Sequence, residues 1–171
     1  MNIKFTKTKS NPLDVLLHGS GGGMEHSNMK MAFDACVEKG HSVVTFNFPF
    51  FERGEEHSSG VELKEEIETL KEVLNKCKAI EYKHIRLIGK SLGAIIAAKY
   101  LSTLSPDVQM RYSVIIFGYD TGMIDISTFP GRIFVIQGEK DKYGNIEIVK
   151  NDLKNAVSKN IEYFEIPKAD H

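Results

Sequence analysis

The sequence has no tryptophan, only two cysteines and five prolines, and its charges nearly cancel to a net −1 over 171 residues. A chain without an excess of basic residues lacks the attraction on which binding to nucleic acid or an anionic membrane depends. Cys36 and Cys77 stand apart, without the Cys and His spacing of a zinc site or the paired spacing of a redox motif. The composition therefore predicts no nucleic-acid partner, no metal and no disulfide.

Long hydrophobic runs are also missing. No stretch approaches the ~20 consecutive apolar residues that cross a bilayer, and residues 1–7 lack the apolar segment of a signal peptide. These absences predict a protein that does not associate with membranes and lies in the cytoplasm. The length suits one domain over residues 1–171 with a sizeable core.

Short apolar runs alternate with segments of helical periodicity. The predicted strands are residues 15–17, 41–48, 85–88, 112–118, 132–138 and 161–166. The fourth and fifth are continuous apolar runs rather than alternating ones, as when both faces of a sheet are covered. This pattern predicts an α/β fold with a doubly wound, mainly parallel sheet of about six strands and helices on both faces. The linker 119–131 is too short for an inserted cap domain. Functional loops of such sheets gather at the carboxyl ends of the strands.

One pentapeptide, Gly89-Lys90-Ser91-Leu92-Gly93, joins a predicted strand to a predicted helix. A G-x-S-x-G sequence in that context is typical of a nucleophile elbow, a sharp turn that presents a serine hydroxyl above the sheet. The alternative is a serine that merely caps the helix. Lys90 lies beside the serine, and its role is left open.

Two nucleotide-binding motifs are excluded because residues that they require are missing. A phosphate-binding P-loop requires glycine at position 84, where the sequence has His84. A dinucleotide fingerprint starting at Gly19 would require its third glycine at Met24 and an acid where Asn47 stands. No cofactor is therefore expected.

The strand ends instead supply the groups needed for acyl transfer. Ser91 is the candidate nucleophile and His171, after the last strand, is the candidate base. Asp141 follows the fifth predicted strand as the candidate orienting acid, and Asp120 after the fourth strand is the alternative.

Two backbone amides are candidates for an oxyanion hole, the pair of donors that stabilises the negative oxygen formed during acyl transfer. Leu92 supplies the amide after the nucleophile. Ser20, in the glycine-rich loop that begins at His18, supplies the second, and His18 is expected to shape that loop by hydrogen bonding. Phe50 is a candidate for lining an acyl pocket, with a core position as the alternative. Arg53 is a candidate for attracting a substrate carboxylate, with a solvated surface position as the alternative.

The sequence resembles the α/β-hydrolase family over nearly its whole length. The matching segments, in family order, are His18-Gly19-Ser20-Gly21, Gly89-Lys90-Ser91-Leu92-Gly93, Gln137-Gly138-Glu139-Lys140-Asp141 and Ala169-Asp170-His171. Two further segments, Asn47-Phe48-Pro49-Phe50 and Glu52-Arg53-Gly54, resemble a small lidless subgroup that is related to dienelactone hydrolases and to the hydrolase-like domain of an NSL chromatin-complex subunit.

The resemblance implies a Ser-His-Asp hydrolase that cleaves a small-molecule carboxylic ester or thioester through an acyl-serine intermediate. It favours Asp141 over Asp120, because Asp141 completes the family's Gly-x-x-Asp pattern. The alternative function is a hydrolase-like binding or scaffold protein that keeps the elbow without a positioned base.

Overall fold

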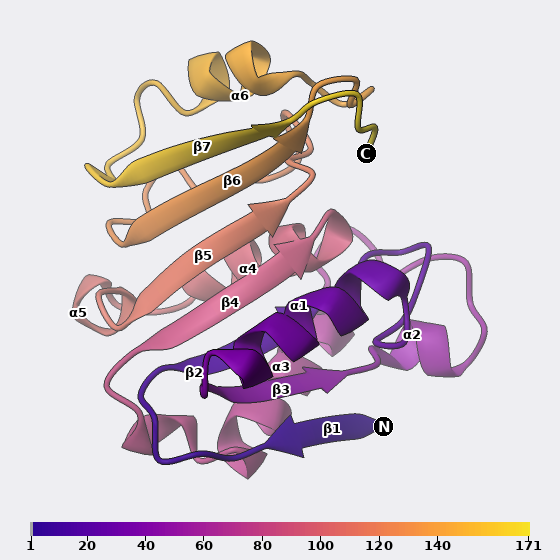
Figure 1. Cartoon of the computed structure of the whole chain (residues 1–171), viewed down its shortest axis with the longest axis vertical. Helices are drawn as coiled ribbons and strands as arrows, with labels where there is room; N and C mark the ends of the chain where they lie inside the picture. The colour runs from indigo at the N-terminus through magenta and orange to yellow at the C-terminus, as the bar shows by residue number, and fades with distance from the viewer. Residues whose placement is uncertain (1) are drawn as a thin grey trace.

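A seven-stranded sheet forms the centre of the computed structural model, which describes residues 2–171 (Figure 1). In sheet order the strands are β1 (Ile3–Thr6), β3 (Ser42–Phe46), β2 (Leu13–Leu17), β4 (Ile85–Lys90), β5 (Tyr112–Phe117), β6 (Arg132–Gly138) and β7 (Ile161–Ile166). All neighbours pair in parallel except β1 with β3. The predicted mainly parallel, doubly wound fold without a cap domain is confirmed.

The strand β1 is the one that the sequence does not predict. It pairs with β3 at the edge of the sheet, from Ile3 beside Phe46 to Thr6 beside Val43, and its first three residues are exposed. An exposed edge strand is held mainly by backbone hydrogen bonds, so it needs no apolar run to mark it. The sheet therefore has one strand more than expected.

Helices cover both faces of the sheet. On one face α1 (Ser27–Glu38) lies over β2 and β3, and on the other lie α3 (Lys64–Lys76) and α4 (Leu92–Ser102) (Figure 1). The shorter helices are α2 (Pro49–Glu52), α5 (Pro106–Gln109), α6 (Ile146–Asp152) and the 3₁₀ turn Ala79–Glu81. Within residues 2–171, no helix has the length and hydropathy needed to cross a bilayer.

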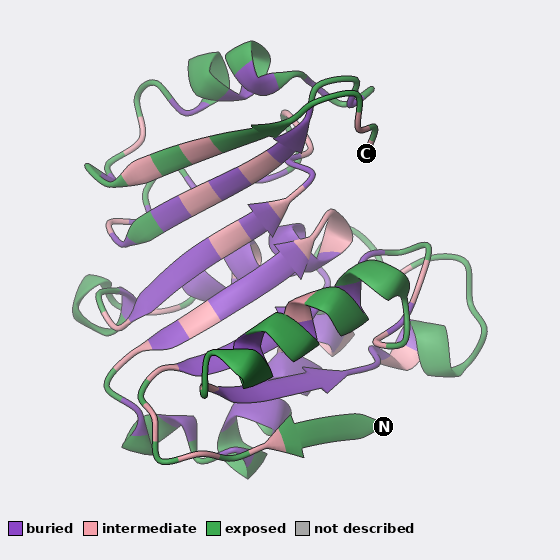
Figure 2. Cartoon of the chain, in the orientation of Figure 1, coloured by how far each residue is buried: buried purple, intermediate pink, exposed green. Residues whose placement is uncertain are grey.

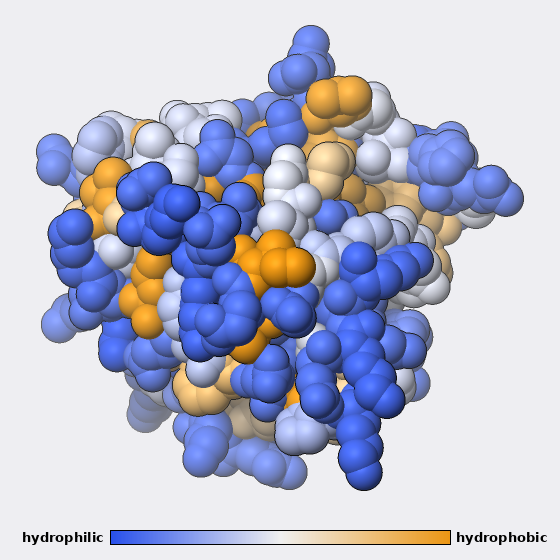
Figure 3. Space-filling view, turned by 90° about the horizontal axis from the view of Figure 1, so that it is seen from above, coloured by the Kyte–Doolittle hydropathy of each residue, from blue (hydrophilic) through white to orange (hydrophobic). Residues whose placement is uncertain are grey.

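Burial is highest in the middle strands and falls toward the edges. β2 and β3 are buried along their whole length, whereas only intermediate and exposed residues form β7 (Figure 2). The helix α4 is buried nearly all round, from Gly93 to Ala98, as its apolar sequence predicts. Figure 3 views the molecule from the β7 side and shows a mainly hydrophilic surface with small hydrophobic patches.

The strand order brings two loops together. The chain runs from β2 outward to β3 and then returns to β4 on the other side of β2, so β2 and β4 are neighbours with Leu17 beside Gly89. The loops that follow these strands, residues 18–23 and the turn at Ser91, therefore start side by side at the carboxyl edge. Such a reversal of strand order is where open α/β sheets form their binding crevices.

A buried ion pair joins β2 to β4 below this crevice. Asp14 is fully buried and accepts two hydrogen bonds from Arg86, both 2.5 Å long, while the His41 ring lies 3.1 Å from the same carboxylate. Asp14 and Arg86 are partners in the β2–β4 ladder, so this pair supports the register that places the two loops side by side.

We predict that Asp14→Asn lowers the free energy of unfolding by about 2 to 4 kcal/mol, because the half-buried Arg86 charge loses its counter-ion. Urea unfolding followed by circular dichroism measures the change. Glu147→Gln is the control: its exposed pair with Lys150 contributes less than about 0.5 kcal/mol. Equal stability of Asp14→Asn and the wild type would contradict the prediction.

Candidate active site

Ser91 occupies a strained turn between β4 and α4. Its backbone has φ 49° and ψ −114°, in the region that residues with a side chain rarely adopt, at a cost of about 1 to 3 kcal/mol. The Ser91 side chain makes no capping hydrogen bond to α4, so it does not serve as the helix cap that the bare sequence also allows. The hydroxyl is left for another use.

The two glycines that flank Ser91 are required by space. A Cβ on Gly93 would lie 2.1 Å from the Leu17 carbonyl oxygen, and one on Gly89 would lie 2.5 Å from the Ala94 nitrogen. Real Cβ atoms do not approach other atoms so closely. The start of α4 therefore packs directly on the backbone at the end of β2.

The structure brings Asp141 and His171 together, 30 residues apart in sequence. The His171 Nδ1 lies 2.8 Å from Asp141 Oδ2, and the Tyr143 amide donates to Asp141 Oδ1 at 2.9 Å. The Asp141 side chain is fully buried. A carboxylate oxygen accepts hydrogen bonds, so the Nδ1–H of His171 is the donor in this contact and Nε2 is the nitrogen left to act as an acceptor. That Nε2 is buried and has no hydrogen-bond partner within residues 2–171.

His171 is the last residue of the sequence, yet its ring is held from several sides. The ring of Tyr143 packs edge-on against it with 4.6 Å between centroids. Gly118, at φ 68°, leaves the space that the imidazole fills, because a Cβ there would lie 2.9 Å from His171 Cε1. The backbone just before it is anchored by the Lys140 amide, which donates to the Ala169 carbonyl at 2.8 Å.

Tyr143 and Gly118 are contacts that sequence reasoning missed. A glycine directly after a strand was the one available signal for Gly118, and nothing in the sequence marks Tyr143. Asp120, the alternative acid, makes no hydrogen bond to His171 within residues 2–171; burial raises the pKa of its carboxyl.

His18 organises the loop after β2. It is buried, its Nε2 accepts from the Phe48 amide at 2.9 Å, and its Nδ1 donates to the Gly19 carbonyl at 2.7 Å. Burial lowers the pKa of this histidine, which matches the neutral form that these two bonds require. Next to this loop, the amides of Ser20 and Leu92 make no hydrogen bond to any residue that the structure describes.

A cavity of about 250 Å³ opens between these loops. It is lined by the glycine loop, the elbow and the terminal histidine, namely Gly19, Ser20, Gly21, Gly22, His26, Met29, Lys90, Ser91 and His171. Ser91 and His171 thus share one cavity, and Asp141 lies behind the histidine. Within residues 2–171, no group of three or more His, Cys, Asp or Glu side chains is arranged to hold a metal ion.

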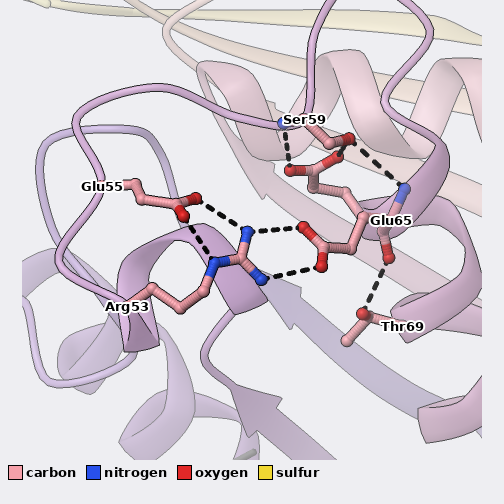
Figure 4. Close-up of polar contacts among 6 residues, drawn as sticks. Arg53, Glu55, Ser59, Glu65 and Thr69 are labelled. Carbon is pink, nitrogen blue, oxygen red and sulfur yellow. Dashed lines mark hydrogen bonds and ion pairs between the residues drawn. The ribbon is translucent and has the colours of Figure 1, made fainter.

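The two predicted substrate contacts are corrected, because neither Phe50 nor Arg53 lines this cavity. Phe50 is fully buried and stacks on Phe48, so it belongs to the core. Arg53 donates to both Glu55 and Glu65 at 2.7 Å, and these carboxylates raise its pKa (Figure 4). Its charge is already balanced on the surface between α2 and α3.

Comparison with known proteins identifies a matching family model and several solved structures with the same fold. A family model described as an alpha/beta hydrolase domain matches residues 11–171. An α/β serine hydrolase homologue from Coxiella burnetii is 23% identical, with a TM-score of 0.77 over 99% of this chain and 82% of that chain. A serine hydrolase without a lid from Xanthomonas campestris is 22% identical, with a TM-score of 0.75 over 99% and 78%.

An esterase from Pyrococcus furiosus is 19% identical, with a TM-score of 0.75 over 99% of this chain and 78% of that chain. A comparison with curated protein sequences finds no significant match. At these identities the solved structures show the fold alone, whereas the family model spans all but the first ten residues. The chain therefore belongs to the α/β-hydrolase family.

Proposed function

We propose that this protein is a serine hydrolase that cleaves a carboxylic ester or thioester through an acyl-serine intermediate. The observation that carries the proposal is the position of His171. Its Nδ1 is engaged by Asp141 at 2.8 Å, while its unpartnered Nε2 belongs to a ring that lines the same cavity as Ser91. A histidine with one nitrogen held by a carboxylate and the other free, on the cavity that contains the serine, supports the role of general base.

In the proposed reaction, His171 Nε2 accepts the proton of the Ser91 hydroxyl as its oxygen attacks the carbonyl carbon of the substrate. Asp141 stabilises the imidazolium that forms. The negative oxygen of the tetrahedral intermediate accepts hydrogen bonds from the Ser20 and Leu92 amides. The imidazolium then gives its proton to the departing alcohol or thiol, and the acyl group stays on Ser91.

The second half of the reaction uses the same groups. His171 accepts a proton from a water molecule, whose oxygen attacks the acyl carbon. The new intermediate collapses, the bond to Ser91 breaks, and its oxygen recovers the proton from His171. The products are a carboxylic acid and the regenerated enzyme, so atoms and charge balance without a cofactor.

One energetic cost favours this function over a scaffold protein. The Ser91 backbone adopts a conformation that costs about 1 to 3 kcal/mol. A fold used only for binding a partner elsewhere gains nothing from this strain, whereas a hydrolase uses the turn to present the serine hydroxyl.

We also propose that the protein belongs among the lidless members of the family, because residues 118–131 join β5 to β6 without an inserted domain. The resemblance to dienelactone hydrolases and to the NSL subunit domain rests on the segment from Asn47 to Gly54 and assigns no substrate.

We predict that a fluorophosphonate probe labels the native protein and that Ser91→Ala abolishes both labelling and hydrolysis of p-nitrophenyl esters, because the probe needs an activated serine oxygen. Mass spectrometry identifies the labelled residue. Ser102→Ala, which removes an exposed hydroxyl at the far end of α4, is the matched control and keeps full labelling. Heat-denatured protein should not react. A native protein that fails to label, or labels equally in Ser91→Ala, would support the scaffold alternative.

The acid is tested by a matched pair of variants. Asp141→Asn removes the acceptor of the His171 Nδ1 proton and favours the wrong tautomer, so kcat should fall by about 10³- to 10⁴-fold. Asp120→Asn, which removes a nearby carboxylate without that contact, should change kcat by less than about 3-fold. Steady-state ester hydrolysis measures both. A larger loss in Asp120→Asn would reassign the acid.

A further inference from the structure

Lys90 is a lysine of the cavity lining that the proposed reaction does not use. It ends β4 immediately before Ser91, and it lines the cavity with that serine. Within residues 2–171, the Lys90 ammonium has no carboxylate within 4.0 Å and no hydrogen-bond acceptor. Exposed lysines such as Lys71 and Lys150, by contrast, form ion pairs at 2.7 Å.

The Lys90 ammonium lies beside His171. A Cβ on Gly118 would lie 3.0 Å from Lys90 Nζ and 3.0 Å from His171 Nδ1, so both groups border the same small space. Partial burial lowers the pKa of the lysine, and the attraction of Asp141 and Asp170 opposes that shift. Asp141 is already bonded to His171 and to the Tyr143 amide. The ammonium of this cavity-lining residue therefore has donors without a partner, close to the His171 ring.

The rest of the cavity lining carries no acidic side chain. No aspartate or glutamate is among its residues, and its other titratable groups are His26 and His171. The remaining wall is largely the glycine loop, residues 19–22, which presents backbone rather than acidic side chains. A half-buried ammonium without a counter-ion gains most from a ligand that brings a negative charge.

We propose that Lys90 binds a carboxylate of the substrate, so that the preferred substrates are small esters or thioesters that carry a carboxylate close to the scissile bond. This inference rests on the proposed function. Lys90 and Ser91 are consecutive residues on one cavity of about 250 Å³, so a carboxylate on Lys90 lies only a few bonds from the attacked carbonyl. Arginine at position 53 cannot supply this charge, because it is paired with two glutamates.

The test compares esters that differ in one charge. Phenyl hemiadipate against phenyl hexanoate places the carboxylate on the acyl side, and 4-carboxyphenyl butyrate against phenyl butyrate places it on the alcohol side. Lys90→Met removes the charge at nearly constant length, Lys90→Arg keeps it, and Lys99→Met removes an equal charge on α4 outside the cavity.

In at least one of the two pairs, we expect Lys90→Met to lower kcat/KM for the carboxylate ester by about 10- to 100-fold. The neutral ester should change by less than about 3-fold. Lys90→Arg should keep most of the preference for the carboxylate ester over the neutral ester, and Lys99→Met should leave that preference unchanged. The pair that responds tells which side of the ester bears the carboxylate. An equal loss on charged and neutral esters, or no loss on either, would overturn the inference.

A binding measurement separates this inference from the proposed function. In the Ser91→Ala background, which cannot form an acyl-serine, isothermal titration calorimetry should detect binding of phenyl hemiadipate or 4-carboxyphenyl butyrate and a loss of at least about 10-fold on adding Lys90→Met. Binding of both compounds that does not depend on Lys90 contradicts the lysine assignment while fluorophosphonate labelling still supports the hydrolase. Absent labelling together with Lys90-dependent binding contradicts the hydrolase and retains the carboxylate site.

Discussion

The contact on which the site depends is the direct packing of α4 on the end of β2. Because a Cβ on Gly93 would meet the Leu17 carbonyl oxygen at 2.1 Å, only glycine allows the helix to start so close to the neighbouring strand. That closeness forces the sharp turn at Ser91 and places it beside the glycine loop that follows β2. The buried Asp14 and Arg86 pair, lower in the same two strands, supports the register of this arrangement.

The loop after β2 is held in place by hydrogen bonds to the backbone and by core packing rather than by surface ion pairs. His18 joins the Gly19 carbonyl to the Phe48 amide, and the surrounding aromatic rings exclude water from those bonds. Hydrogen bonds in such an environment are stronger than exposed ones, so the loop that bears the Ser20 amide is held in advance of any ligand. Preorganised donors avoid the cost of reorganising during a reaction.

The sequence predicts the features that local pattern determines. Apolar runs mark six of the strands, and the two glycines around Ser91 mark the turn, because each depends on neighbouring residues alone. The exposed strand β1 and the roles of Phe50 and Arg53 depend on distant partners: β3 pairs with β1, Phe48 stacks on Phe50, and Glu65 binds Arg53. Aromatic and cationic residues at a strand end fit a pocket and a core equally well until those partners are known. The close approach of Asp141 to His171 was expected from strand order, whereas its support by Tyr143 and Gly118 was not readable.

The His171 imidazole is held by contacts from three parts of the chain. Asp141 lies 2.8 Å from its Nδ1, the Tyr143 ring packs edge-on against it, and Gly118 leaves open the space beside it. A Cβ at position 118 would lie 3.0 Å from both His171 Nδ1 and Lys90 Nζ, so a side chain there would displace at least one of the two groups. The lack of a side chain after β5 therefore allows the imidazole and the ammonium to lie together at this end of the sheet.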